Sequence, residues 1–242
     1  MAFTLISRNL SKMIPLTDNH PTHHRPYLTW LILASCIGVF ILQNTSPLGF
    51  EAIVNIYGLI PAYTVGGQLD PEMLNTGWNA LFSSMFMHGD ISHIAGNMLY
   101  LYVFGDNIEN ALYRTRGLLA GRARYLSFYL LGGILAALSH AVLEPLSTVP
   151  MIGASGAISA VLGAYLVLYP KQPIPVALPY VGITELPAYW VLGSWFAYQL
   201  LHGVLVDPAG GGVAFWAHIG GFVAGMALIY PFGGRKRPVL WR

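Results

Sequence analysis

The sequence contains few charged residues. Only 9% of its 242 residues are charged and 55% are hydrophobic, whereas about 25% of the residues in ordinary soluble domains are charged. A soluble fold of this length needs more polar surface than the chain can supply. The composition therefore argues against a soluble globular protein and indicates that the lipid bilayer is the solvent. The net charge of +2 is too small to favour a nucleic-acid partner.

The sequence has a single cysteine, and we expect no cleavable leader at its start. The single cysteine, Cys36, lies within a hydrophobic segment, so no disulfide can form within the chain. We expect it to be a small buried hydrophobic residue. Residues 1–26 show no apolar core followed by a small-residue cleavage site, which argues against a cleaved secretion signal. The first apolar segment is therefore expected to remain in the protein.

The charged residues divide the chain into six apolar segments, which we expect to form six transmembrane helices. A full span needs ~20 apolar residues, with ~17 tolerated, so the second and fourth segments are short. Both are rich in small or polar residues, which predicts that they lie centrally and are shielded from lipid. The predicted class is all-α, a polytopic bundle with a long outer loop between helices one and two. The six segments are Tyr27–Leu42, Ile91–Gly105, Tyr125–Leu143, Ser155–Tyr169, Leu186–Val206 and Ala214–Tyr230.

The positive charges predict the orientation of this bundle. With both ends cytoplasmic, all 12 lysines and arginines fall in the two tails, the loop between helices two and three and the loop between helices four and five. This is the distribution that the positive-inside rule describes. We therefore expect a cytoplasmic tail (1–26), a six-helix core (27–231) and a basic cytoplasmic tail (232–242). The charged residues left in the outer loops are all acidic: Glu51, Asp70, Glu72, Asp90, Glu144 and Asp207.

Two of the outer loops have an unusual composition. The loop from Gln43 to Asp90 contains many apolar and aromatic residues, so we expect it to pack on the membrane or partly within it. The connection Asp207–Val213 is rich in glycine, which makes it a candidate lid.

Polar residues within membrane spans are costly, and each is therefore a candidate for function. Ser155 begins the fourth segment in the sequence Gly153-Ala154-Ser155-Gly156. A helix N-terminus directs free N–H groups and a positive dipole end toward this point, which suits an alkoxide nucleophile and an oxyanion. A serine that only caps a helix in a small-residue packing motif fits the same tetrapeptide. On the tetrapeptide alone, the packing role is favoured.

The position of His218 favours a catalytic role for Ser155 over a packing role. His218 lies about one turn after the start of the sixth segment, so we expect it at the same shallow depth as Ser155. A serine and a histidine on closely packed helices form a nucleophile–base pair. The interiors of segments three to six contain no Asp or Glu, so the pair is expected to act as a dyad without an acidic third member. Small residues that let helices approach closely recur every fourth position at Ser155, Ser159 and Gly163, and at Ala217, Gly221 and Gly225.

A third group of polar residues lies at the start of the second segment. His93 and Asn97 are four residues apart, so they share one helical face. Both can donate hydrogen bonds, as an oxyanion hole of side chains requires. A zinc site formed by His88, His93 and His218 is the alternative. It is disfavoured because the chain has no His-Glu-x-x-His and because Asp90 is the only nearby carboxylate.

Together these motifs resemble the rhomboid family of intramembrane serine proteases. They occur in the order of that family, from about residue 78 to residue 230, on a matching six-helix topology. The matching strings are His88-x4-His93-x3-Asn97, Phe104-Gly105-Asp106-Asn107, Gly153-Ala154-Ser155-Gly156 and Ala217-His218-Ile219-Gly220-Gly221-x3-Gly225.

The resemblance implies a serine endopeptidase with a Ser155–His218 dyad and without a cofactor or metal. It implies an oxyanion hole built from the side chains of His93 and Asn97 and the backbone N–H of Ser155. The substrates would be transmembrane proteins, cut at or near the outer end of a span and preferentially at small residues. Residues with a structural role near the site would be His88, Gly153, Gly156, Gly221 and Gly225.

The resemblance also implies that substrates enter laterally from the lipid, near helices two and five. Trp195 and Phe196 are candidates for the gate at that entrance. The sequence shows no sign of a seventh span or of a large cytosolic domain, so we expect a compact member of the family in a bacterial or archaeal cell membrane. The site would open to the outer side of that membrane.

The sequence departs from the family at two positions. Many members carry Trp-Arg in the first outer loop, where this chain has Trp78-Asn79. Some members have an aromatic residue four positions after the serine, which stacks on the histidine. This chain has Ser159 there, and a hydrogen bond from Ser159 is our prediction for what orients His218.

Two other functions compete with proteolysis. A rhomboid-like pseudoprotease that escorts membrane clients would lack the serine or the histidine, and both are present. A small transporter or channel would need ionisable residues deep in the bundle, where this chain has only histidines.

Overall fold

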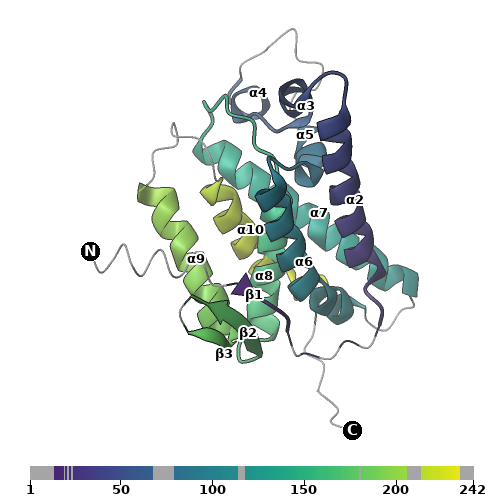
Figure 1. Ribbon diagram of the computed structural model, residues 1–242, viewed down its shortest axis with the longest axis vertical. Coiled ribbons are helices and arrows are strands. Elements are labelled where there is room, and N and C mark those ends of the chain that lie inside the picture. Colours follow the sequence, from purple (N-terminus) through teal and green to yellow (C-terminus); the bar gives the residue numbers. More distant parts are fainter. Residues whose placement is uncertain are drawn as a thin grey trace.

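The computed structural model describes residues 14–18, 20, 22, 24–67, 79–113, 118–179, 181–205 and 214–234. Within these residues the protein is mostly helical, and each of the six apolar segments forms a helix (Figure 1). The six helices are α2 (Tyr27–Thr45), α6 (Ile91–Leu112), α7 (Leu118–Leu143), α8 (Ser155–Leu168), α9 (Ala188–Leu205) and α10 (Phe215–Leu228).

Helix α8 is the central helix of the bundle. It packs against α6, α7, α9 and α10, and ten of its 14 residues are buried. Small side chains make this arrangement possible because they let the surrounding helices approach its backbone. The prediction that the fourth apolar segment is shielded by the others is confirmed.

The contact between α8 and α10 is backbone against backbone. A Cβ atom built on Gly163 of α8 would overlap the carbonyl group of Phe222, and one on Gly225 of α10 would overlap the carbonyl group of Ala160. Only glycine fits at these two positions. The small-residue ridges that the sequence predicted on the two helices therefore face each other.

Helix α6 continues beyond the predicted end of the second segment. The sequence prediction ended at Gly105, but the helix continues past Asp106, which is half-buried and accepts a hydrogen bond from Asn107, and past Glu109, which is buried. The carboxylate of Glu109 accepts hydrogen bonds from the backbone N–H groups of Leu28 (3.1 Å) and Thr29 (2.8 Å) at the start of α2. A carboxylate at a helix N-terminus neutralises the positive end of the helix dipole, so the charge stabilises the junction of α2 with α6.

The all-α prediction needs correction because the structure also contains a small sheet. Strands β1 (Ile14–Pro15), β2 (Pro173–Leu178) and β3 (Gly182–Pro187) form an antiparallel sheet in the order β1-β2-β3. The sheet lies at one end of the bundle, below α8 and α9 in Figure 1. The sequence analysis did not predict β2, because two of its residues are prolines and proline is uncommon within strands.

The loop between α2 and α6 is folded against the other end of the bundle (Figure 1). Its elements are short: α3 (Phe50–Tyr57), α4 (Pro61–Thr64), α5 (Ala80–Ser83) and the 3-10 helix η1 (Ser84–Phe86). Leu59 pairs with Met151 through backbone hydrogen bonds of 3.0 and 2.7 Å. Leu59 also packs with Leu81 and Ala137 in a small apolar cluster, so this part of the loop is not a solvated linker.

Trp78, the candidate lid Asp207–Val213 and most of the two predicted tails (1–26 and 232–242) lie outside the described residues. By length and hydropathy, two helical stretches within the described residues can cross a bilayer, Tyr27–Thr45 and Leu119–Leu143. The apolar helices α8 and α10 are shorter.

Candidate active site

Ser155 and His218 lie next to each other, as the sequence predicted. The Nε2 atom of His218 is 2.8 Å from the Oγ atom of Ser155. Ser155 begins α8, so the N–H groups around it are not yet used by the helix ladder. The turn before it requires Gly153, whose φ of 133° is a backbone conformation that side-chain-bearing residues rarely adopt.

The other ring nitrogen of His218 also has a partner. Its Nδ1 atom lies 2.9 Å from Oε1 of Gln199, a residue of α9, and both side chains are buried. The predicted bond from Ser159 to His218 is wrong, because the Ser159 hydroxyl instead donates to the backbone carbonyl of Ser155 at 2.7 Å. The sequence analysis missed Gln199. A strongly polar side chain within an apolar segment was the signal that could have found it.

His93 lines the same cavity as Ser155. Its helix is capped by Asp90, whose Oδ1 accepts from the backbone N–H of His93 at 2.9 Å. The backbone N–H of Gly89 donates to His93 Nδ1 at 3.3 Å, which in the neutral ring leaves the proton on Nε2. A Cβ built on Gly153 would lie 2.8 Å from His93 Nε2 and 3.5 Å from Ser155 Oγ. The N–H of His93 and the hydroxyl therefore border the same small space.

Asn97 lies one turn further along α6 and lines the same cavity as His93, Ser155 and His218. Its side chain is only 8% exposed, and its Nδ2 atom has no hydrogen-bond partner in the structure. A buried donor without an acceptor costs about 1–3 kcal/mol. The cost is removed when an oxygen atom of a bound molecule accepts a hydrogen bond from Nδ2 of Asn97.

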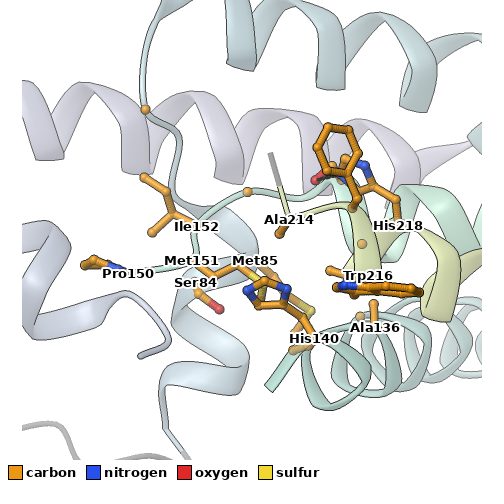
Figure 2. Close-up of a pocket in the computed structure, with 18 of the residues that line it drawn as sticks. Ser84, Met85, Ala136, His140, Pro150, Met151, Ile152, Ala214, Trp216 and His218 are labelled. Carbon is orange, nitrogen blue, oxygen red and sulfur yellow. Dashed lines mark hydrogen bonds between the residues drawn. The ribbon is translucent and has the colours of Figure 1, made fainter. Parts of the chain in front are cut away.

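The four side chains meet at a cavity of about 580 Å³, a size typical of ligand sites. Figure 2 shows His218 and Trp216 on one side of this cavity and Met151 and Ile152 on the other. His140 projects into the space between them. Its Nε2 atom lies 3.9 Å from the carboxylate of Glu144, which also lines the cavity.

His88 is fully buried behind His93. Its backbone N–H donates to Oε1 of Gln43 at 3.1 Å, and its carbonyl accepts from Nε2 of the same side chain at 3.4 Å. Burial lowers the pKa of His88 to about 4, and the neighbouring His93 contributes to this shift. His88 is therefore neutral at pH 7 and connects the outer loop to α2 through its backbone.

The alternative of a zinc site finds little support in these positions. Both ring nitrogens of His218 already have partners. Across the part of the chain that the structure describes, no three His, Cys, Asp or Glu side chains are grouped closely enough to hold a metal ion.

The predicted gate residues Trp195 and Phe196 are half-buried and face α10. The Trp195 ring centroid is 5.9 Å from that of His218, and Phe196 stacks on Phe222 at 4.7 Å. Trp195 lies one helical turn before Gln199. One face of α9 therefore contacts the histidine twice.

The remaining predicted glycines lie directly beneath the dyad. A Cβ on Gly221 would overlap the carbonyl oxygen of Gly156, and a Cβ on Gly156 would lie 2.8 Å from the Cβ of Ala136. Gly225 makes the same kind of contact one turn deeper in the bundle. These glycines allow α7, α8 and α10 to pack closely enough for Ser155 and His218 to meet.

Comparisons with known proteins agree with the motifs. The rhomboid domain matches residues 75–235. Rhomboid protease GlpG of Klebsiella pneumoniae is 27% identical over 217 residues, which are 89% of this chain and 67% of that protein. Rhomboid-related protein 2 of Mus musculus is 30% identical over 164 residues, 66% of this chain and 49% of that protein. Putative rhomboid protease YdcA of Bacillus subtilis is 29% identical over 125 residues, 49% of this chain and 58% of that protein. The chain thus spans about half to two thirds of the length of these relatives.

Proposed function

The chain belongs to the rhomboid family, and from this premise we propose that it is an intramembrane serine endopeptidase. It hydrolyses peptide bonds at or near the outer end of transmembrane segments in membrane-anchored proteins. The observation that carries the proposal is the 2.8 Å contact between Ser155 Oγ and His218 Nε2 at the edge of a cavity. A nucleophile within hydrogen-bond reach of its base is the arrangement that acyl transfer needs.

The proposed reaction follows from the atoms in place. His218 Nε2 accepts the hydroxyl proton while Ser155 Oγ attacks the carbonyl carbon of the substrate. The tetrahedral oxyanion accepts hydrogen bonds from Nε2–H of His93, Nδ2–H of Asn97 and the backbone N–H of Ser155. His218 then gives its proton to the leaving amine, and water hydrolyses the acyl-enzyme by the same route. No cofactor enters these steps.

We further propose that all six longer helices cross the bilayer of a bacterial or archaeal cell, with both ends cytoplasmic. The basic residues support this orientation: ten of the 12 lie in the tails and the two inner loops, and the other two, Arg122 and Arg124, lie in the first two turns of α7, at its inner end. The site then opens to the outer side, where water can reach the cavity. Substrate helices enter from the lipid past Trp195 and Phe196, and small residues near the cut fit a cavity bordered by Gly153 and Gly156.

Covalent labelling tests the proposal. A fluorophosphonate probe is expected to react with Ser155 in native membranes, and Ser155→Ala is expected to abolish both labelling and cleavage of a single-span reporter. Ser35→Ala is the matched control, because Ser35 lies on α2 outside the cavity lining and its hydroxyl donates to the carbonyl of Leu31. Cleavage that persists in Ser155→Ala, or that a metal chelator stops, would contradict the dyad.

A further inference from the structure

Gln199 occupies the place that an acidic residue has in a Ser–His–Asp triad. Its Oε1 atom lies 2.9 Å from His218 Nδ1, on the side of the ring away from Ser155. We propose that Gln199 is the positioning residue of the His218 base and that it makes the dyad depend on the docking of α9 against α10. This inference rests on the proposed protease function.

The tautomer of His218 follows from the acceptor. The Oε1 atom of an amide can only accept a hydrogen bond, so Nδ1 of His218 carries the proton. The lone pair of Nε2 then points at the Ser155 hydroxyl, as a general base requires. In the other tautomer Nε2–H would face Ser155 and could not take its proton.

Other groups near His218 do not provide this function. The Ser159 hydroxyl is committed to the backbone carbonyl of Ser155. The centroid of the Trp195 ring lies 5.9 Å from that of His218, and the two rings are inclined by 36°. Trp195 therefore limits the space beside the imidazole, but its indole N–H is only a donor and cannot accept a hydrogen bond from Nδ1. The exposed fractions of Gln199 and His218 are only 6% and 9%, so water competes poorly for Nδ1.

A neutral amide also suits the environment better than a carboxylate would. An ionised side chain inside a membrane protein carries a large desolvation cost, whereas an amide that is hydrogen-bonded carries a small one. The amide orients the ring without requiring a charge at this depth.

The position of Gln199 couples the dyad to one helix. Gln199 and Trp195 share the face of α9 that contacts α10, and Phe196 on the same helix stacks on Phe222 of α10 at 4.7 Å. If α9 moves away from α10 to admit a substrate, the Gln199–His218 bond breaks. The base is then correctly held only after α9 has docked again.

Variants at position 199 test this role in the full chain, reconstituted in liposomes with the single-span reporter. Gln199→Leu keeps the approximate size of the side chain but removes the acceptor. We expect its kcat to fall about 10- to 100-fold with little change in KM, which is less than the ~10⁴-fold loss on disrupting the charged orienting group of a triad. The rate of fluorophosphonate labelling of Ser155 should fall by a similar factor. Gln199→Glu retains an acceptor and should recover part of this rate, the remainder being lost to the larger desolvation cost of its carboxyl group.

Controls separate this proposal from a purely structural role and from the proposed function. Leu200→Ala, at an exposed position on the same helix, should keep the wild-type rate. If Gln199→Leu does not fold, Gln199→Met is measured in its place, since it is of similar length and its thioether is only a weak acceptor. A wild-type kcat in the apolar variant, or equal losses in the apolar variant and Gln199→Glu, would overturn the positioning role. If the wild-type protein is neither labelled at Ser155 nor active, the protease function itself fails.

Discussion

Gly221 of α10 lies so close to the carbonyl oxygen of Gly156 on α8 that a Cβ atom on Gly221 would overlap it. Gly156 follows Ser155 in the chain, and Gly221 lies three residues after His218. This contact sets the distance between α8 and α10 at the depth of the dyad. The 2.8 Å separation of Ser155 Oγ and His218 Nε2 therefore depends on two residues that have no side chain.

We predict that Gly221→Ala separates the two helices and inactivates the protein. The added methyl group must displace the Gly156 carbonyl, and overpacking of this kind typically costs about 1–3 kcal/mol of stability. The rate of fluorophosphonate labelling of Ser155 should fall more than ~10-fold, because a 1 Å misplacement can already cost ~100-fold in rate. Gly38→Ala on α2 is the control, since nothing lies within 4 Å of the added Cβ. Wild-type labelling of Gly221→Ala would contradict the close-packing argument.

The unpartnered amide of Asn97 leads to a second prediction. Asn97→Ala should lower kcat by ~10²–10³-fold, the loss expected when one oxyanion donor is removed. KM should change little, because the donor acts mainly on the transition state. Steady-state kinetics on the reporter measures both quantities. Asn44→Ala, which removes an exposed amide that bonds only to the Phe40 carbonyl on α2, serves as the comparison. An unchanged kcat would exclude Asn97 from the oxyanion hole.

Glu109 is predicted to stabilise the fold without taking part in catalysis. Glu109→Ala leaves the backbone N–H groups of Leu28 and Thr29 without their acceptor, and hydrogen bonds to a charged group contribute about 1.5–3 kcal/mol each. We expect a lower melting temperature in detergent, while the Ser155 labelling rate of the folded fraction stays near that of the wild type. Glu51→Ala removes an exposed carboxylate of α3 and should leave the melting temperature unchanged. An equal melting temperature for Glu109→Ala would show that this junction contributes nothing.

The attachment of the N-terminal segment to the helices should depend on pH through Asp18. Burial raises the pKa of Asp18, although hydrogen bonds from Tyr165 (2.6 Å) and Asn107 (2.8 Å) oppose the shift. A raised folded-state pKa means that folding favours the protonated acid. The contribution of this group is therefore full below its ordinary pKa of about 4 and is lost as pH rises through the folded-state value.

Asp18→Asn tests this pH dependence. Asparagine is neutral at every pH and its Oδ1 can accept both hydrogen bonds, so the variant should be more stable than the wild type at pH 7. The difference should shrink as pH falls toward 4. Hydrogen exchange of the Leu16 amide, which donates to the carbonyl of Pro175 at 3.0 Å, is measured across this range with melting temperatures in parallel. A stability difference that does not vary with pH would refute the assignment to Asp18.

Much of the helical architecture could be predicted from local sequence. Apolar segments between charges located all six longer helices, because desolvation prevents unpaired charges from lying in a span. The same rule failed at Asp106 and Glu109, where α6 continues because both carboxylates accept hydrogen bonds, the first half-buried and the second buried. It also missed β2, since its prolines indicate a loop and its pairing with β1 joins segments far apart in the chain.

By itself the sequence determined which residues could meet. Helical periodicity, a local property, gives the spacing of the small residues and the shared face of His93 and Asn97. The start of α8 at Ser155 is also a local property of the chain. Only the tertiary structure decided what holds His218. Ser159 lies on the same helix as Ser155, so its hydroxyl bonds back to that residue's carbonyl, whereas Gln199 reaches His218 because α9 packs on α10 with that face inward. The rotation of one helix against another depends on the packing of many side chains at once, and no single motif encodes it.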